Sequence, residues 1–223
     1  FIPFPKEELT ELRLIEVAIL NYFFPIITGH LVVEIGDVTL NSDSIREQSK
    51  KYSGGKIHDA EQLFEFSQDS YTSAEGALIS AKPEWQMNGA LTDASFTESQ
   101  LEKMREQFSL GKLVGVKVPI SIHKKDGSQE ASFLKLFLQA PEGLTVGQDL
   151  YVRGSITVPK ESRFGDRRAL GLLIADDKPV SSFLGDAENA AHVRWSSRAE
   201  KLQRNYRNPG ATLKVIRTSL VQF

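Results

Sequence analysis

The segment FLGDAENAAHVRW, residues 183–195, places two carboxylates, a histidine and a tryptophan within thirteen positions. Asp186 follows a glycine and precedes helix-forming residues, so we expect its carboxylate to cap a helix by accepting backbone N–H bonds. Glu188 would then lie in the first helical turn, which favours acidic side chains. His192, four residues after Glu188, would share its helix face, a spacing that lets two side chains reach one metal ion.

Two ligands do not make a metal site, and the sequence has neither HExxH nor a histidine-rich segment among its four histidines. The pattern therefore predicts no metal site and favours a capped helix. Two alternatives stay open. One is a docking surface formed by Asp186, Glu188, His192 and Trp195. The other is a hydrolase built on Asp186, Glu188 and His192.

A second candidate lies in RGSITVPKESRFGDRR, which carries Arg153, Arg163, Arg167 and Arg168 in and after a predicted pair of strands. Arginine contacts phosphate through two parallel hydrogen bonds, which lysine cannot do. These side chains are therefore candidates for a phosphate or partner contact, and the alternative is a solvated loop. Arg153, inside a strand, is expected to be structural. A Walker loop, a GxGxxG motif and a GxSxG nucleophile elbow are all absent from the sequence, so we assign no catalytic residue.

The net charge of −2 is unevenly distributed along the chain. Residues 151–223 hold thirteen Lys and Arg against seven Asp and Glu. Arg194, Arg198, Lys201 and Arg204 recur at intervals of three or four, which predicts a basic stripe on one helix with Leu202 and Tyr206 buried opposite. Such a stripe is either a solubilising face or a surface that binds a nucleic-acid backbone.

Composition narrows the class of protein. With 40% hydrophobic and 25% charged residues, the 223-residue chain is typical of globular proteins. The absence of cysteine excludes disulfides, thiolate zinc sites and a cysteine nucleophile, and it favours a cytoplasmic location. The longest apolar run, residues 14–27, is interrupted by Glu16, Asn21 and Pro25 and is too short to span a membrane. We expect no membrane partner.

The periodicity of apolar residues predicts an α+β fold with a mixed, mainly antiparallel sheet and flanking helices. Gly36-Asp37 and Asp126-Gly127 are expected to form hairpin turns. Residues 1–110 would form a mainly helical part with a small hairpin, and residues 111–223 a sheet followed by C-terminal helices, the two packed as one unit. Helices are expected over 7–27, 44–52, 59–71 and 95–112 and from about 180, 198 and 210; strands are expected within 30–42, 113–125, 131–140, 149–158 and 169–177.

Three segments carry a family resemblance: DLYVRGSITVP, RALGLLIADDKPVSSFLGDAENAAHVRW and AEKLQRNYRNPGATLKVIRTSL. They resemble the region downstream of the nucleotide-binding domain in large bacterial proteins of the GHKL class, which includes gyrase B, histidine kinases and the heat-shock chaperone. The matching positions are Tyr151-Val152-Arg153, Leu172-Leu173-Ile174 and Leu184 to Trp195, with Ala190 where the pattern has proline. Of the two elements that bind ATP in this class, the DxGxG loop is absent from the sequence, and Glu16 to Asn21 bears only a distant likeness to the asparagine helix.

The resemblance implies that the chain is a fragment that follows an ATPase domain, and a start without methionine agrees with that expectation. It implies a non-catalytic module that couples the ATPase to a partner or substrate. ATP and magnesium would be bound upstream, and no cofactor in this chain. Expected partners are the upstream ATPase domain and a protein or nucleic-acid client, with a homodimer also open. The alternative function is a nucleic-acid-binding module that uses the basic C-terminal third.

Overall fold

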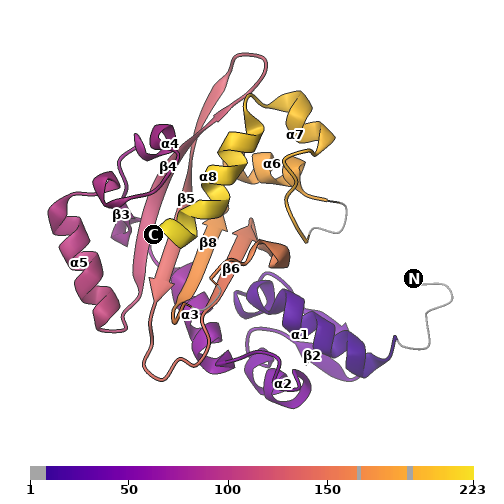
Figure 1. Ribbon diagram of the computed structural model, residues 1–223. Helices are drawn as coiled ribbons and strands as arrows, with labels where there is room; N and C mark the ends of the chain where they lie inside the picture. Colours follow the sequence, from indigo (N-terminus) through magenta and orange to yellow (C-terminus); the bar gives the residue numbers. More distant parts are fainter. Residues whose placement is uncertain (1–8, 165–166, 190–192) are drawn as a thin grey trace. The chain divides into compact units, whose positions relative to one another are not determined.

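The computed structural model describes residues 9–164, 167–189 and 193–223. The contacts divide the chain into two compact units, Phe1–Tyr71 and Thr72–Phe223. Helices, a mixed sheet and a separate antiparallel hairpin make this an α+β protein, as the sequence predicts. Figure 1 shows the elements of both units with the labels used below.

The first unit combines three helices with a short hairpin. Its elements are α1 (Glu11–Ile27), β1 (Val33–Ile35), β2 (Val38–Leu40), α2 (Ile45–Tyr52) and α3 (Ala60–Thr72). The hairpin turns at Gly36, whose φ of 55° is a left-handed conformation that glycine adopts without strain. Phe23 of α1 packs against Phe64 of α3 with ring centroids 5.2 Å apart, in a core that also contains Ile19 and Phe24.

Helix α1 ends at the predicted residue but begins later than the sequence predicts. It begins at Glu11, because the side chain of Thr10 accepts a hydrogen bond from the backbone N–H of Arg13 and caps the first turn. The predicted start near residue 7 lies outside the described residues. Pro25 lies inside its last turn, and the helix continues to Ile27, the predicted end.

The second unit is built on a six-stranded sheet with the order β3-β4-β5-β8-β6-β7. The pairs β4-β5, β5-β8 and β6-β7 are antiparallel, and β3-β4 and β6-β8 are parallel. Asp126 forms the predicted hairpin turn between β4 and β5 by accepting hydrogen bonds from the N–H and hydroxyl of Ser128. The strands are β3 (Ile79–Ser80), β4 (Val114–His123), β5 (Gln129–Gln139), β6 (Gln148–Arg153), β7 (Ile156–Thr157) and β8 (Leu170–Ala175).

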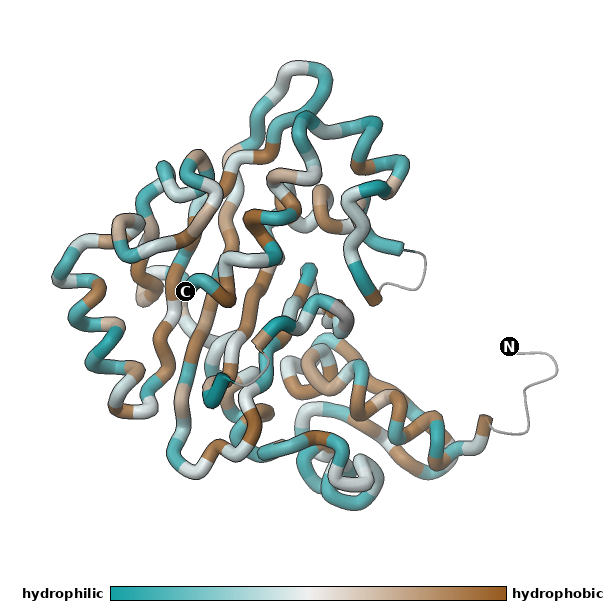
Figure 2. The backbone as a smooth tube through the Cα atoms, in the orientation of Figure 1, coloured by the Kyte–Doolittle hydropathy of each residue, from teal (hydrophilic) through white to brown (hydrophobic). Residues whose placement is uncertain are grey.

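One face of this sheet packs against helices. Leu101 and Met104 of α5, Phe183 of α6 and Leu213 of α8 join the inward-facing strand residues in one buried cluster. Figure 1 shows α8 lying across the sheet, and in Figure 2 the central strands are largely hydrophobic while the β4-β5 turn and α7 are hydrophilic. The helices are α4 (Trp85–Asn88), α5 (Glu98–Ser109), α6 (Lys178–Ala187), α7 (Glu200–Asn205) and α8 (Pro209–Gln222), with 3-10 turns at Glu75–Ala77, Asp93–Ser95 and Pro159–Glu161.

The division between the units falls after Tyr71, whereas the sequence placed it near residue 110. Residues 72–110 belong with the sheet for two reasons. The strand β3 pairs with β4, and α5 buries Leu101 and Met104 in the sheet's core. Helix α5 itself follows its prediction, because Thr97 and Gln100 form a reciprocal capping box at its start.

The strand β3 pairs with only two residues of β4, and farther along the same edge the backbone of β4 forms hydrogen bonds with side chains. The indole Nε1 of Trp85 donates to the carbonyl of Pro119. The amide of Gln86 donates to the carbonyl of Ser121 at 2.8 Å and accepts from its N–H at 2.7 Å. We predicted neither a helix nor a strand for residues 81–88, yet Trp85 is only 1% exposed.

Helix α6 corrects the expectation for Asp186. It begins at Lys178, with Pro179 in its first turn and with Val180, Phe183, Leu184 and Ala187 buried at helical spacing. Asp186 is therefore in the last turn and does not cap a helix. Its carboxylate accepts a hydrogen bond from the amide of Asn205 at 3.0 Å, which links α6 to α7.

None of the helices among the described residues is both long and apolar enough to cross a bilayer.

Candidate functional site

Arg153, at the end of β6, forms a two-pronged ion pair with Glu188. The guanidinium Nε and Nη2 each donate to one carboxylate oxygen, the second at 3.0 Å. The Glu188 side chain is only 2% exposed. The indole Nε1 of Trp195 donates to the same carboxylate at 3.4 Å, and an antiparallel bridge joins the backbones of Glu188 and Trp195. Glu188 is thus held by one strand and by the segment that returns to it.

A second buried carboxylate, Glu161, connects Trp195 to Arg217 of α8. Its oxygens accept from Nε and Nη2 of Arg217 at 2.7 and 2.8 Å and from the backbone N–H of Trp195 at 2.9 Å. Nη2 of Arg217 also donates to the carbonyl of Trp195. We call Arg153, Glu161, Glu188, Trp195 and Arg217 the glutamate network.

The glutamate network contains two of the four predicted docking residues, Glu188 and Trp195. Glu188 adopts extended backbone just after α6, so it does not lie in a first helical turn. His192 itself lies outside the described residues. Asp186 bonds to Asn205 instead, and burial raises the pKa of the nearby Tyr206 hydroxyl to about 12, with Asp186 adding to the rise. The structure therefore brings together Glu188, Trp195 and Arg153, but not Asp186.

A buried carboxylate positions the remaining arginines. Asp149 of β6 is 5% exposed, and it accepts hydrogen bonds from the Ser162 hydroxyl and from the backbone N–H groups of Arg163 and Phe164. Three donors from consecutive residues fix the backbone at the start of the predicted arginine segment. We call Arg163, Phe164, Arg167 and Arg168 the arginine loop.

Two glycines let the arginine loop lie against the sheet. A Cβ added at Gly171 of β8 would stand 2.4 Å from the Phe164 ring, so the ring packs directly on the backbone there. A Cβ at Gly147, just before β6, would stand 1.4 Å from the carbonyl oxygen of Arg167. Both distances are shorter than a real contact, which means that any larger residue would displace the loop.

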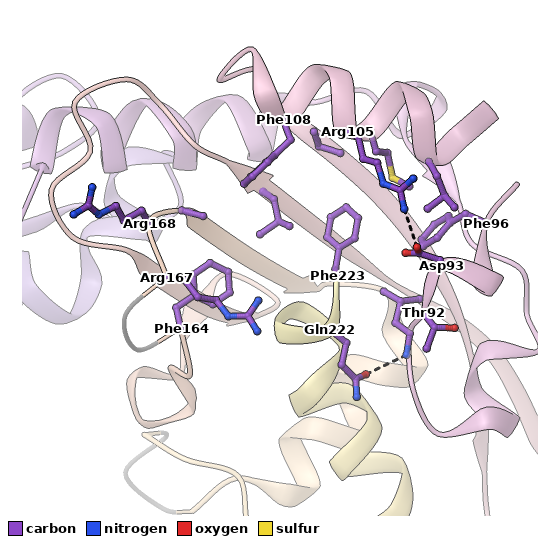
Figure 3. Close-up of a pocket in the computed structure, with 16 residues that line it drawn as sticks. Thr92, Asp93, Phe96, Arg105, Phe108, Phe164, Arg167, Arg168, Gln222 and Phe223 are labelled. Carbon is purple, nitrogen blue, oxygen red and sulfur yellow. Dashed lines mark hydrogen bonds and ion pairs between the residues drawn. The ribbon is translucent and has the colours of Figure 1, made fainter. Parts of the chain in front are cut away.

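The arginine loop forms one wall of an apolar groove of about 490 Å³. The helix α5, the ends of β4 and β5, the segment before α5 and the end of α8 form the other walls (Figure 3). The apolar lining residues are Leu91, Phe96, Leu101, Met104, Phe108, Val114, Leu138, Phe164, Ala169 and Phe223; the polar ones are Thr92, Asp93, Arg105, Arg167, Arg168 and Gln222.

Charged side chains lie at the rim of the groove, and they differ in their partners. Arg105 pairs with Asp93 at 2.8 Å. Among the described residues, neither Arg167 nor Arg168 has a carboxylate partner, and both are exposed. Figure 3 shows the Arg167 guanidinium directed toward Gln222 and Phe223, whereas that of Arg168 points away from the other labelled residues. The Arg167 guanidinium also lies 5.8 Å from the centre of the Phe164 ring.

The four predicted arginines thus occupy three environments. Arg153 is paired in the glutamate network, and Arg163 is 41% exposed with Glu161 at 3.6 Å. Arg167 and Arg168 line the groove. Sequence reasoning predicted the α5 helix but missed the groove, since Phe108, Phe164 and Phe223 come from segments that no local pattern connects.

The predicted basic stripe does not lie on one helix. Ala199 has non-helical backbone, and helix α7 covers only Glu200–Asn205. Arg194 and Arg198 therefore lie before the helix. Leu202 and Tyr206 are buried at 0% and 4% exposure, as the sequence predicts.

Comparison of the chain with protein-family models, with curated proteins and with solved structures found no match. Over the residues that the structure describes, no group of three or more His, Asp or Glu side chains is arranged to hold a metal ion.

Proposed function

We propose that the chain is a non-catalytic module that couples a GHKL-type ATPase domain to a partner or substrate. The family resemblance supplies the ATPase, and the arginine loop is the contact element. The observation that carries the proposal is the exposed Arg168, which has no carboxylate partner among the described residues and whose guanidinium points away from the other labelled residues of the groove (Figure 3). A guanidinium in that position is free to take a phosphate or carboxylate from a neighbour through two hydrogen bonds.

The buried polar contacts support a role in coupling. Asp149 holds the start of the arginine loop through Arg163 and Phe164, and Arg163 also lies 3.6 Å from Glu161. Glu161 in turn is paired with Arg217 of α8. A series of charge-assisted contacts therefore connects the arginine loop to helix α8. In this proposal, a displacement of the loop alters the position of α8 through these contacts.

In this proposal ATP and magnesium bind to the neighbouring domain, and the module acts in the cytoplasm. The chain alone is expected to bind ATP no more tightly than the millimolar range, because the sequence has no phosphate-cradling loop. Calorimetric titration with ATP and magnesium measures this directly. Micromolar affinity would contradict the proposal.

The decisive experiment uses the natural polypeptide that contains this chain. Arg168→Gln is expected to lower its steady-state ATP turnover by about 100-fold if the guanidinium stabilises charge on the nucleotide. The matched control is Arg198→Gln, which removes another exposed arginine from a different part of the unit and should leave turnover unchanged. A natural polypeptide without an ATPase domain, or equal rates for Arg168→Gln and wild type, would overturn the proposal.

The nucleic-acid alternative predicts a different result from the same pair of variants. Salt-dependent binding to duplex DNA or RNA that Arg198→Gln weakens, with ATP turnover unaffected by either variant, would favour the alternative.

A further inference from the structure

We propose that the groove binds an amphipathic monocarboxylate, a molecule with an unbranched acyl chain and one terminal carboxylate. The chain would lie on the apolar lining and the carboxylate would bond to Arg167. This inference goes beyond the proposed function, because it rests on Arg167 and the groove, whereas the coupling role rests on Arg168.

The lining of the groove suits an acyl chain. Ten of the lining residues are apolar, and they include four phenylalanine side chains from separate segments. Phe108, Leu138 and Phe223 are only half-buried, so apolar surface remains in contact with water. Covering that surface with methylene groups is favourable in proportion to the area removed from water. The volume of about 490 Å³ lies in the range of small-molecule sites.

The charges at the rim select an anion. The Arg105 charge is balanced by Asp93, whereas Arg167 has no carboxylate partner in the described part of the chain. Its guanidinium is directed toward Phe223, so a carboxylate bonded to it would place the attached chain over the apolar lining (Figure 3). Apolar walls lower the local dielectric and strengthen such a charge-assisted pair. A neutral or cationic amphiphile has no equivalent partner.

The groove is already shaped to receive this ligand. Asp149 fixes the backbone of Arg163 and Phe164, and Phe164 packs on Gly171 beneath the Arg167 guanidinium. On the opposite wall, the side chain of Gln222 accepts from the backbone N–H of Leu91 at 3.1 Å and ties the end of α8 to the segment before α5. Walls that are fixed in advance reduce the ordering cost of binding.

The test is a calorimetric titration of the chain with dodecanoate, decanoate and octanoate, each below its micelle concentration. We expect one dodecanoate per chain, with affinity falling about fourfold for each methylene removed, because each buried methylene contributes a nearly constant free energy. Dodecanol and dodecyltrimethylammonium serve as the neutral and cationic probes. Both should bind at least tenfold more weakly than dodecanoate.

Two variants of one loop separate the proposed contact from a general charge effect. Arg167→Gln should weaken dodecanoate binding at least tenfold, while Arg168→Gln, which removes the same charge one residue away, should change it less than twofold. Phe108→Ala should shorten the apolar wall and weaken dodecanoate about tenfold. Thermal unfolding of each variant checks that the fold is intact.

Several outcomes overturn the inference. These are no dodecanoate binding, equal binding of dodecanol, no dependence on chain length, or equal effects of Arg167→Gln and Arg168→Gln. An apolar peptide as the true occupant would produce the first or third of these results. None of them bears on the coupling role, which is tested by ATP turnover in Arg168→Gln.

Discussion

The glutamate network and the arginine loop place the same residue type in opposite environments. Arg153 and Arg217 meet buried carboxylates, and their charges are neutralised inside the unit. Arg167 and Arg168 lie at a surface groove without carboxylate partners among the described residues. Whether an arginine is paired depends on carboxylates that are distant in the sequence. Glu188 is 35 positions from Arg153, and Glu161 is 56 positions from Arg217. Clusters of charge in a sequence therefore do not by themselves distinguish structural from binding residues.

The largest effect should come from breaking the glutamate network. Glu161→Gln removes the charge that balances Arg217, and we expect a loss of about 3 kcal/mol in the free energy of unfolding, since breaking a buried pair leaves an uncompensated charge. Urea unfolding measured by tryptophan fluorescence reports on this unit, because both tryptophans, Trp85 and Trp195, belong to it. Glu102→Gln, on an exposed position of α5, is the control and should shift stability by less than about 0.5 kcal/mol. An equally small shift for Glu161→Gln would show that the network adds no stability.

An intermediate effect is expected where the sheet meets the arginine loop. Gly171→Ala should cost about 2 kcal/mol, because the added methyl group overlaps the Phe164 ring and forces it to move. The displaced ring should also weaken dodecanoate binding, so this variant affects both stability and the groove. Gly76→Ala is the control, since a Cβ there meets no atom within 4 Å. Unfolding and titration of the two variants give the result, and unchanged behaviour of Gly171→Ala would mean that the loop adjusts freely.

The smallest effect is expected for an arginine of the arginine loop. We compare the same substitution, Arg→Gln, in the arginine loop and in the glutamate network. Arg168→Gln should change the free energy of unfolding by less than about 0.5 kcal/mol, as exposed replacements usually do. Arg153→Gln should cost about 2 kcal/mol, because it leaves the 2% exposed Glu188 carboxylate without its partner. The same urea experiment measures both. Similar losses for the two variants would erase the proposed distinction between structural and surface arginines.

Local sequence patterns predicted most helices and strands, but they did not predict which of these elements contact one another. The α5 helix and the β4-β5 hairpin were predictable because their signals, the Thr97 cap and Asp126-Gly127, act within a few residues. The prediction that Asp186 caps the start of a helix was wrong. Pro179 and the apolar residues that follow it start the helix earlier than the capping pattern suggested.

The candidate site was predicted only in part. The arginine loop was singled out from its residue types, but its separation into Arg163, Arg167 and Arg168 depends on Asp149, Gly147 and Gly171, none of which carries a recognisable motif. The groove was missed because α5, the arginine loop and the end of α8 meet only in the folded chain.

The side chains along β4 have a consequence for self-association. Trp85 and Gln86 bond to the outward-facing groups of Pro119 and Ser121, and proline has no N–H to offer at that edge. A strand from another copy of the chain would need this row of donors and acceptors, which is how exposed sheet edges nucleate aggregates. With the row occupied, sheet extension at residues 119–121 would first have to break these bonds. Pairing of two copies at these residues would therefore cost the side-chain bonds that Trp85 and Gln86 make.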